Sequence, residues 1–454
     1  MLTGTGTAGA YHAGVLKALQ EAGVKIDIVA GRGIGAASAT FAAIDAGEQL
    51  WGAAGSWSTE TAARFYRWRW TLRLGVLALG LALGALLVPL TVLVGGLALF
   101  PAGFVLQLFG LETGGWLAVQ YAGLVEALFD PGGLPLYLPR FVTVMLLLLL
   151  GVLSVGAVIV WLRARLRRRA RGGLWWELLG SPLDQSLATK TLARKLWTVV
   201  CGSGSAARPD ATELGERYAQ LLAENTGQPG FRDLLLLVHD LDARRDFVAA
   251  LLSEPFRRSF FLRRQGDDAA ERHLETLDLA DTGRRQLMDM LAASLSLPVA
   301  TEPHLTRFPD ESAWQGETHR LCDRPESTVR LLEEVANAGA EQVILVSACG
   351  WPSEPGRLTS GRRDPLGRVG ESLVAVESAS IRDALALPSR LFEVVFQIRP
   401  THNPLGPFDF NGSYDELSDR RHTLAELVSR GYEDAFSQFV NSVVGASGEW
   451  IDSR

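Results

Sequence analysis

The chain has 454 residues, 48% of them hydrophobic, and a formal net charge of -6, so it is long enough for two or three domains. Its three cysteines, Cys201, Cys322 and Cys349, lie far apart, which excludes a disulfide framework and a zinc-binding pattern and suits a reducing compartment. The sequence contains no internal repeat and no long low-complexity segment, and no motif calls for a metal or another cofactor.

A glycine-rich stretch opens the chain. Gly4-Thr5-Gly6-Thr7-Ala8-Gly9 predicts a tight loop, and a helix is expected to continue from it to Gly23. The spacing also matches the dinucleotide-binding fingerprint, which needs a strand before the glycines and an acid at the end of the second strand. Only three residues precede the glycines, and the nearest acid, Asp27, begins the second strand, so nucleotide binding is the weaker alternative. Either the first strand is very short or the chain starts late.

A short strand, Ile26 to Ala30, leads directly into Gly31-Arg32-Gly33-Ile34-Gly35, and a helix of small residues follows over Ala36 to Ala46. The five-residue segment has the frame of a nucleophile elbow, G-x-S-x-G, whose flanking glycines leave room for a strained strand-to-helix turn. In its order of glycine-rich loop, helix, strand, elbow and helix, the segment 4–47 resembles the patatin-like phospholipase family. The resemblance implies a doubly wound α/β fold.

In that family the elbow serine attacks an acyl ester and an aspartate is its base, so the resemblance implies a Ser/Asp dyad. It also implies an oxyanion hole made by the backbone N–H groups of Gly4, Thr5 and Gly6; the basic residue often found before the third glycine is replaced by Ala8. Gly33 stands where the serine belongs and has no hydroxyl group. We therefore expect a lipid acyl hydrolase fold with impaired catalysis, because glycine keeps the turn and relieves the strain that a serine would carry.

A different nucleophile is the alternative that keeps the protein active. Ser38 lies more than one helical turn beyond Gly33, so its side chain is expected to point away from the elbow. Ser372 and Ser447 stand in the segments Gly370-Glu371-Ser372 and Gly445-Ala446-Ser447, which begin like an elbow but lack the closing glycine.

Arg32 is unusual, because family elbows commonly carry a small residue at this position. A cation beside the empty apex would hold a phosphate or a carboxylate of a ligand. The competing interpretation is a surface salt bridge.

Two long segments contain no charged residue, 74–111 and 141–162. Roughly 20 apolar residues cross a hydrocarbon core of about 30 Å, so each segment is long enough for a transmembrane helix. We predict spans at about 74–100 and 141–162, with the rest of the first segment tilted, kinked near Pro89 and Pro101, or lying in the interface. Buried core helices are the alternative.

Arginines flank the two segments on their outer sides: Arg64, Arg67, Arg69, Arg73, Arg163, Arg165, Arg167, Arg168, Arg169 and Arg171. The connection between the segments carries Glu112, Glu126 and Asp130 and only one arginine, Arg140. By the positive-inside tendency this predicts a multi-pass protein of the cell (inner) membrane with its soluble part on the cytoplasmic side. Membrane lipids, and not nucleic acid, are the expected partners, since arginines beside a span hold anionic headgroups; the oligomeric state is left open. Tryptophans gather near the same boundaries, as in interfacial belts: Trp57, Trp68, Trp70, Trp161, Trp175 and Trp176.

The α/β pattern resumes after a polar helical stretch from Glu177 to Asn225. The segment 231–242 is typical of a buried strand and ends in His239-Asp240-Leu241-Asp242, which resembles the T-D-L-D turn of the family. Because side chains alternate along a strand, both aspartates face one side and His239 faces the other, which favours a structural turn over a metal site. The segment Met290 to Pro298 resembles the family's A-S-x-x-x-P turn.

Asp323 is the candidate base. It precedes a predicted helix over Val329 to Ala338 and a strand over Gln342 to Ser347, the spacing at which the family places its D-G-G or D-G-A aspartate. Arg324 and Pro325 replace the glycines of that motif, so the turn cannot be identical, and pairing with Arg320 or Arg324 is the competing role. Asp409, before Phe410-Asn411-Gly412, is a weaker alternative because it lacks the expected strand context.

Helical apolar spacing recurs over 369–387 and 415–439. The predicted architecture is a patatin-like doubly wound α/β sheet interrupted by a transmembrane helical hairpin. The predicted division is 1–60 for the glycine-rich loop and elbow, 61–173 for the juxtamembrane and transmembrane insertion, 174–365 for the rest of the patatin-like domain, and 366–454 for a helical C-terminal region. Three functions follow: a membrane-anchored, catalytically impaired protein that binds lipids, an active lipid acyl hydrolase with another nucleophile, or a non-catalytic membrane interaction module.

Overall fold

The computed structural model divides the chain into two compact units. Unit 1 comprises Met1–Arg67 and Leu183–Arg454, and unit 2 comprises Trp68–Pro182. The structure describes the whole chain except residues 59, 112, 133–137, 167–179, 203–206, 263–271, 351–363, 387–390, 402–404, 416–419 and 445–454.

Unit 1 is built on a nine-stranded sheet of order β11-β10-β1-β2-β5-β6-β7, with β9 paired to β5 and β8 to β9. The strands β11, β10, β1, β2 and β5 run parallel, whereas β6 and β9 run antiparallel to β5. The strands of this sheet are β1 (Leu2–Thr3), β2 (Ile28–Arg32), β5 (Asp233–Asp240), β6 (Arg245–Leu251), β7 (Thr276–Asp278), β8 (His304–Arg307), β9 (Thr318–Cys322), β10 (Gln342–Ser347) and β11 (Val394–Ile398). Two small sheets pair β3 (Arg67–Trp68) with β4 (Leu183–Asp184) and β12 (Ser413–Asp415) with β13 (Arg420–His422).

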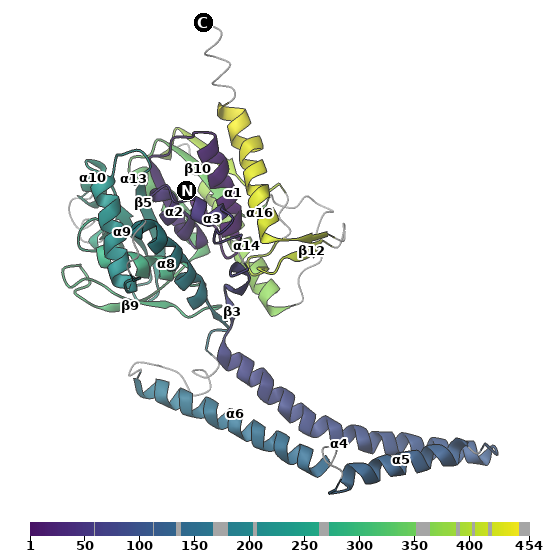
Figure 1. The fold of residues 1–454 in the computed structure, drawn as a ribbon. Coiled ribbons are helices and arrows are strands. Elements are labelled where there is room, and N and C mark those ends of the chain that lie inside the picture. Colours follow the sequence, from purple (N-terminus) through teal and green to yellow (C-terminus); the bar gives the residue numbers. More distant parts are fainter. Residues whose placement is uncertain are drawn as a thin grey trace. The chain divides into compact units, whose positions relative to one another are not determined.

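Helices cover both faces of the large sheet (Figure 1). The helices of unit 1 are α1 (Ala8–Glu21), α2 (Ile34–Ala43), α3 (Glu48–Trp51), η1 (Ala62–Arg64), α8 (Ser186–Cys201), α9 (Ala211–Asn225), α10 (Phe256–Leu262), η2 (Arg284–Gln286), α12 (Leu287–Ser294), η3 (Pro325–Ser327), α13 (Thr328–Asn337), α14 (Pro365–Leu385), α16 (Leu424–Ala435) and η4 (Phe436–Val444). The strand β5 shows why two layers form: Leu234 and Leu236 join the core beneath α1, α2 and α9, while Leu235 and Leu237 join a separate core beneath α13. Its near-continuous apolar run is therefore buried on both faces, as in a doubly wound parallel sheet.

Most elements that the sequence predicts are present, with shifted ends. The predicted strand over Gln342 to Ser347 is β10, and the predicted segment 231–242 contains β5. The first strand, β1, has two residues and lies in the middle of the sheet, between β10 and β2. The predicted helical C-terminal region, 366–454, contains strands as well as helices, because β11 extends the large sheet and β12 and β13 form a hairpin before α16.

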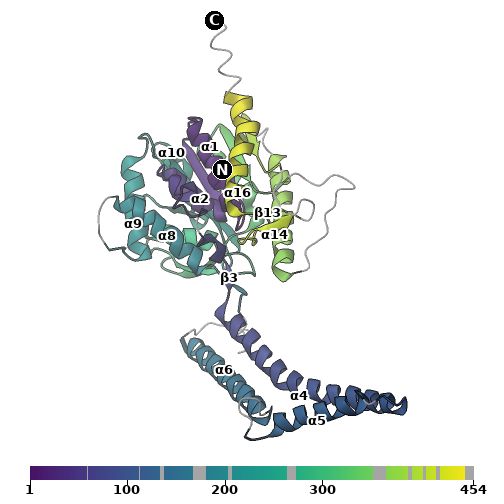
Figure 2. The same cartoon turned by 45° about the vertical axis from the view of Figure 1, so that its right-hand side comes forward.

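Unit 2 consists of α4 (Trp70–Leu108), α5 (Thr113–Phe129) and α6 (Leu138–Leu166), and α4 packs against both of the others (Figure 2). In the part of the insertion that the structure describes there are therefore three helices, where the sequence predicted a hairpin of two. The sequence left open whether the end of the first apolar segment is tilted, kinked or interfacial. The structure has one continuous helix of 39 residues there, and it contains Pro89 and Pro101. Two helical segments have the length and hydropathy to cross a membrane, Trp70–Leu108 and Leu138–Ile159, and 6% of the residues in each most apolar window are buried.

The tryptophans do not all share the interfacial environment that we expected. Trp57 is buried in the core of unit 1, where its ring approaches Gly9, so its assignment to a membrane belt is wrong. Trp68 and Trp161 are exposed, at 42% and 48%. Trp175, Trp176 and Arg167 to Arg171 lie outside the described residues.

The helices α1 and α16 pack closely, and Gly431 lies at their contact, where an added Cβ would be 2.3 Å from the carbonyl oxygen of Tyr11. Alanine normally favours a helix over glycine by about 1 kcal/mol. We expect the opposite sign for Gly431→Ala, a loss of about 1–3 kcal/mol in the free energy of unfolding, because the helices must separate. Chemical unfolding in detergent measures this; Ser429→Ala, at an exposed position of the same helix, is the control. A stabilising Gly431→Ala would contradict the close packing.

Candidate active site

The predicted elbow forms the junction between β2 and α2. Gly33 has φ 57° and ψ -137°, a conformation that glycine adopts freely and that strains other residues. An added Cβ on Gly33 would lie 2.3 Å from the carbonyl oxygen of Gly4 and 2.9 Å from Oδ2 of Asp323. Gly31 and Gly35 also permit close backbone contacts, since an added Cβ would lie 2.4 Å and 2.1 Å from the nearest carbonyl oxygens. The apex therefore faces both the glycine-rich loop and the predicted base, although these are far apart in the sequence.

Asp323 follows β9 directly and is 1% exposed. Its backbone N–H donates to the carbonyl oxygen of Ser296 at 2.7 Å, so the A-S-x-x-x-P segment holds it. The predicted pairing with Arg320 or Arg324 does not occur: Arg320 binds Asp242, and Arg324 lies near Asp246 and Glu326.

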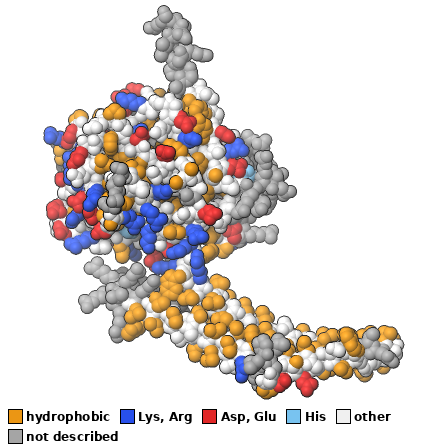
Figure 3. Space-filling model, viewed as in Figure 1, with side chains coloured by type: hydrophobic (Ala, Val, Ile, Leu, Met, Phe, Trp, Pro, Cys, Tyr) orange, Lys and Arg blue, Asp and Glu red, His pale blue; other side chains and the backbone are white. Residues whose placement is uncertain are grey.

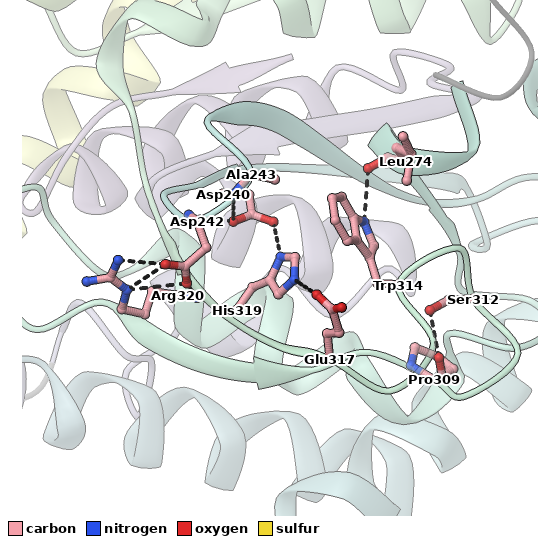
Figure 4. Close-up of polar contacts among 10 residues, drawn as sticks. All are labelled: Asp240, Asp242, Ala243, Leu274, Pro309, Ser312, Trp314, Glu317, His319 and Arg320. Atoms are coloured by element: carbon pink, nitrogen blue, oxygen red, sulfur yellow. Dashed lines mark hydrogen bonds and ion pairs between the residues drawn. The ribbon is translucent and has the colours of Figure 1, made fainter. Parts of the chain in front are cut away.

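The His239-Asp240-Leu241-Asp242 segment supports this strand and holds no metal-ligand arrangement. Asp240 accepts hydrogen bonds from the N–H groups of Asp242 and Ala243 and contacts Nδ1 of His319 at 2.5 Å, as Figure 4 shows. Asp242 binds the guanidinium of Arg320, with the shortest contact at 2.6 Å. Among the residues that the structure describes, no group of three His, Cys, Asp or Glu side chains could hold a metal ion. The polar turn therefore fixes β9, and with it Asp323.

His319 lies between two carboxylates in this cluster (Figure 4). Burial disfavours the charged imidazolium, but hydrogen bonds to Asp240 and Glu317 outweigh burial and raise the pKa of His319. The ring also makes edge contacts with Trp314 and Phe308. These contacts give His319 a structural role between β5 and β9.

The side chain of Arg32 is fully buried in the site, at 0% exposure, so its charge must be paired within the protein. Its Nη1 lies 3.1 Å and 3.0 Å from the two carboxylate oxygens of Asp323, and its Nε donates to Oγ1 of Thr328 at 3.1 Å. Its Nη2 lies 3.0 Å from Oε1 of Glu377, on α14. Arg32 therefore forms a buried salt bridge and not the surface salt bridge of the competing interpretation, and its guanidinium contacts two carboxylates of the protein.

Glu377 is the site residue that the sequence interpretation missed. It lies at helical spacing between Val374 and Ile381, and a carboxylate on the inner face of an amphipathic helix was the available signal. It is 2% exposed. The buried charge cluster therefore contains one cation, Arg32, and two carboxylates, Asp323 and Glu377.

Burial raises the pKa of Asp323 to about 6; the positive charge of Arg32 opposes this change, and the negative charge of Glu377 adds to it. A general base must be ionised and must reach the proton that it accepts. Both carboxylate oxygens of Asp323 already accept hydrogen bonds from Arg32. Asp323 has the position of a base, but both of its carboxylate oxygens are hydrogen-bonded to the guanidinium of Arg32.

The predicted oxyanion hole is covered by a segment from the far end of the chain, residues 405–410, which we call the capping loop. Thr7 donates from its N–H to the carbonyl oxygen of Pro407 at 3.0 Å and from Oγ1 to that of Gly406 at 2.9 Å. An added Cβ on Gly6 would lie 1.9 Å from the Pro407 oxygen, so only glycine permits this approach. Among the hydrogen bonds of the described residues, none uses the N–H of Thr5 or Gly6 as donor. The N–H groups of Thr5 and Gly6, donors of the predicted oxyanion hole, therefore lie beneath the carbonyl group of Pro407.

Aromatic side chains hold the capping loop in place. Phe410 stacks on Tyr66 with ring centroids 5.6 Å apart and meets the edge of Phe65 at 6.1 Å. Phe408 contacts Tyr66 at 6.2 Å. Asp409, the alternative base, accepts a hydrogen bond from the N–H of Gly406 at 2.9 Å and so stabilises the loop itself.

Ser38 points away from the elbow, toward a histidine. Its Oγ lies 3.5 Å from Nδ1 of His12, whose Nε2 lies 2.9 Å from the carbonyl oxygen of Thr3. Because a carbonyl oxygen only accepts, Nε2 carries the proton and Nδ1 accepts from Ser38. Both side chains are buried between α1 and α2, at 1% and 0% exposure, so the pair has the polarity of a catalytic dyad without access to substrate. Ser372 lies within α14, and Ser447 lies outside the described residues.

We expect Arg32→Met to lower the free energy of unfolding by about 3–5 kcal/mol, because it leaves two buried carboxylates without a cation. Arg320→Met breaks an exposed pair and should cost about 1 kcal/mol or less. The folded-state pKa of Asp323 is raised, so its favourable contribution exists at low pH and is lost as the pH rises through about 6. The deficit of Arg32→Met should therefore shrink as the pH falls toward 4. Unfolding curves at several pH values measure it; equal losses in the two variants would contradict a buried cluster.

Comparison with known families agrees with this geometry. The family model for patatin-like phospholipase matches residues 1–102, which include the glycine-rich loop, α1 and the elbow. No curated protein matches the chain. The sheet is mostly parallel and covered by helices on both faces, as the resemblance implied. The N-terminal part of the chain, residues 1–102, is therefore similar to the patatin-like phospholipase family.

Proposed function

We propose that this protein is a membrane-anchored patatin-like protein that binds membrane lipids and does not hydrolyse them. The observation that carries the proposal is the buried pairing of Arg32 with Asp323 beside an elbow apex that has no hydroxyl group. Hydrolysis by this fold needs a nucleophile, a free base and donors for the oxyanion. The first is missing at Gly33, the second is bound by Arg32, and the third lie beneath the capping loop.

The anchoring part of the proposal depends on unit 2. In α4 the described buried residues are Ala78 and Gly103, and most of the other residues of this helix are exposed. Figure 3 shows this surface as a nearly continuous hydrophobic coat on unit 2. Exposed apolar helices of this length are stable in a bilayer, where backbone groups are satisfied internally and lipid contacts the side chains. We assign unit 2 to the cell (inner) membrane, with the flanking arginines and unit 1 on the cytoplasmic side.

The lipid-binding part of the proposal depends on the capping loop. The carbonyl oxygen of Pro407 accepts a hydrogen bond at the start of α1, where an ester carbonyl or a carboxylate of a lipid would be bound. The rings of Tyr66, Phe408 and Phe410 form the apolar contact beside it. If the capping loop moves aside, the same donors and rings are available to the head and the acyl chain of one lipid molecule.

Hydrolysis of a fluorogenic phospholipid by the full chain in nanodiscs tests the loss of catalysis. We expect the unmodified protein to match protein-free nanodiscs. Gly33→Ser should stay inactive as well, because its Cβ would lie 2.3 Å from the carbonyl oxygen of Gly4 and Asp323 remains bound by Arg32. Turnover by the unmodified protein would refute the proposal, and its loss in Ser38→Ala would identify Ser38 as the nucleophile.

Movement of the capping loop is tested by hydrogen exchange with mass spectrometry in nanodiscs. Phe410→Ala removes the stack on Tyr66, and aromatic pairs contribute about 0.5–1.5 kcal/mol beyond their buried area. Because the buried area is lost as well, we expect exchange in the peptide that contains the Thr7 amide to rise about tenfold or more. Phe396→Ala is the matched control, because it removes an aromatic contact with Phe439 away from the loop. Unchanged exchange in Phe410→Ala would mean that the loop does not open.

A further inference from the structure

Unit 1 carries a group of exposed cations close in sequence to the ends of unit 2. We call Arg64, Arg67, Lys190 and Arg194 the basic patch; all four side chains are exposed. Arg64 ends η1, which packs against α8, the helix of Lys190 and Arg194. In Figure 3, Lys and Arg side chains gather on the part of unit 1 where Figure 1 shows α8 and β3. The basic patch is therefore a continuous feature of one surface.

The helix α8 presents its cations on one face. Ala188, Leu192 and Leu196 are buried against the core, whereas Lys190 and Arg194 are exposed one turn apart. Residues four apart lie on the same side of a helix, and like charges at this spacing repel each other. The neighbouring Lys195 binds the carbonyl oxygen of Ala54 and adds further positive charge. A negatively charged partner would relieve this repulsion.

The described part of the chain does not supply such a partner. Within the described part of the chain, Arg64, Lys190 and Arg194 have no carboxylate in ion-pair contact, and Arg67 contacts Asp184 at 3.8 Å. Other exposed arginines of unit 1 are paired, as in Arg217–Glu213 and Arg285–Glu216. The acids nearest in sequence to the basic patch are Glu60 and Asp184, so the patch has four cations and two neighbouring acids.

The chain itself limits how far the basic patch lies from unit 2. An extended chain spans at most about 3.6 Å per residue, so Arg67 lies within about 11 Å, and Arg64 within about 22 Å, of the first residue of α4, Trp70. On the return, α8 begins at Ser186, three residues after unit 1 resumes at Leu183. If α4 crosses a bilayer, these distances let Arg64 and Arg67 reach its headgroup layer, and the contact between η1 and α8 lets Lys190 and Arg194 approach the same surface.

We infer that the basic patch binds anionic phospholipid headgroups of the membrane that unit 2 crosses. This inference rests on the proposed membrane anchoring. Phosphate oxygens accept hydrogen bonds from guanidinium and ammonium groups, and a cation near an anionic membrane surface strengthens binding about fivefold. Lys190 and Arg194 together therefore contribute up to about 25-fold at low salt, and less at high salt because ions screen exposed charges.

The test uses the full chain in vesicles of phosphatidylcholine, with or without phosphatidylglycerol. A fluorescent label is attached to the cysteine of Thr198→Cys, one turn beyond Arg194 on the exposed face of α8. A spin label on the lipid headgroups quenches its fluorescence when α8 lies close to the membrane surface. Cys201→Ser removes the nearby native thiol. We expect strong quenching only with phosphatidylglycerol, and a large reduction in 0.5 M salt, where the screening length falls to about 4 Å.

Charge variants complete the test. Lys190→Glu with Arg194→Glu should abolish the dependence on phosphatidylglycerol, and the neutral pair Lys190→Gln with Arg194→Gln should weaken it while the melting temperature stays unchanged. Lys25→Glu, a matched charge reversal with an 89% exposed side chain just before β2, should have no effect. Equal quenching in both kinds of vesicle, or quenching unaffected by the double reversal, would overturn the inference.

Flotation of the same vesicles in high salt separates the two proposals. All variants are expected to float, because the apolar helices and not the basic patch anchor the protein. A protein that fails to float overturns the anchoring and, with it, the inference. A protein that floats but is quenched independently of lipid charge overturns the basic patch alone.

Discussion

The buried ion cluster of Arg32, Asp323 and Glu377 is the interaction on which the rest of the site depends. A fully buried arginine is stable only when its charge is paired and hydrogen-bonded. Here its partners come from β9 and α14, so the pairing fixes the end of β2 against two elements that follow it by about three hundred residues. The same pairing occupies the oxygens that a catalytic base would use. The ion pair that stabilises the fold therefore also makes Asp323 less available as a general base.

The elbow keeps its shape although its chemistry has changed. Gly33 retains the backbone conformation that would present a nucleophile, and the close approaches at Gly31 and Gly35 are retained with it. A glycine at the apex lets the carbonyl oxygen of Gly4 come closer than any Cβ would permit. The carbonyl group of Gly4 lies in the space that a side chain at position 33 would need.

The capping loop fills space at the glycine-rich loop, as the backbone of Gly4 does at the elbow. Its Pro407 carbonyl group satisfies a donor at the start of α1, and aromatic contacts with Phe65 and Tyr66 hold it there. Tyr66 also donates to the carbonyl oxygen of Leu295, in the segment that holds Asp323. Tyr66 therefore contacts both the capping loop and the segment that holds Asp323. It precedes Arg67, the last residue of the first segment of unit 1.

The sequence by itself determined the features that depend on local spacing: the elbow frame with Gly33 at its apex, the apolar run of β5, the helix and strand after Asp323, and the two long uncharged segments. Each is set by backbone sterics or by hydrophobic periodicity over a few neighbouring residues. Only the tertiary structure decided that Arg32 is buried against Asp323 and Glu377, that Asp242 and not Asp323 pairs with Arg320, that Pro407 covers the glycine-rich loop, and that β11 joins the sheet. These outcomes depend on which distant residues share one low-dielectric interior, where a charge must find its partner, and sequence spacing carries no record of that distance.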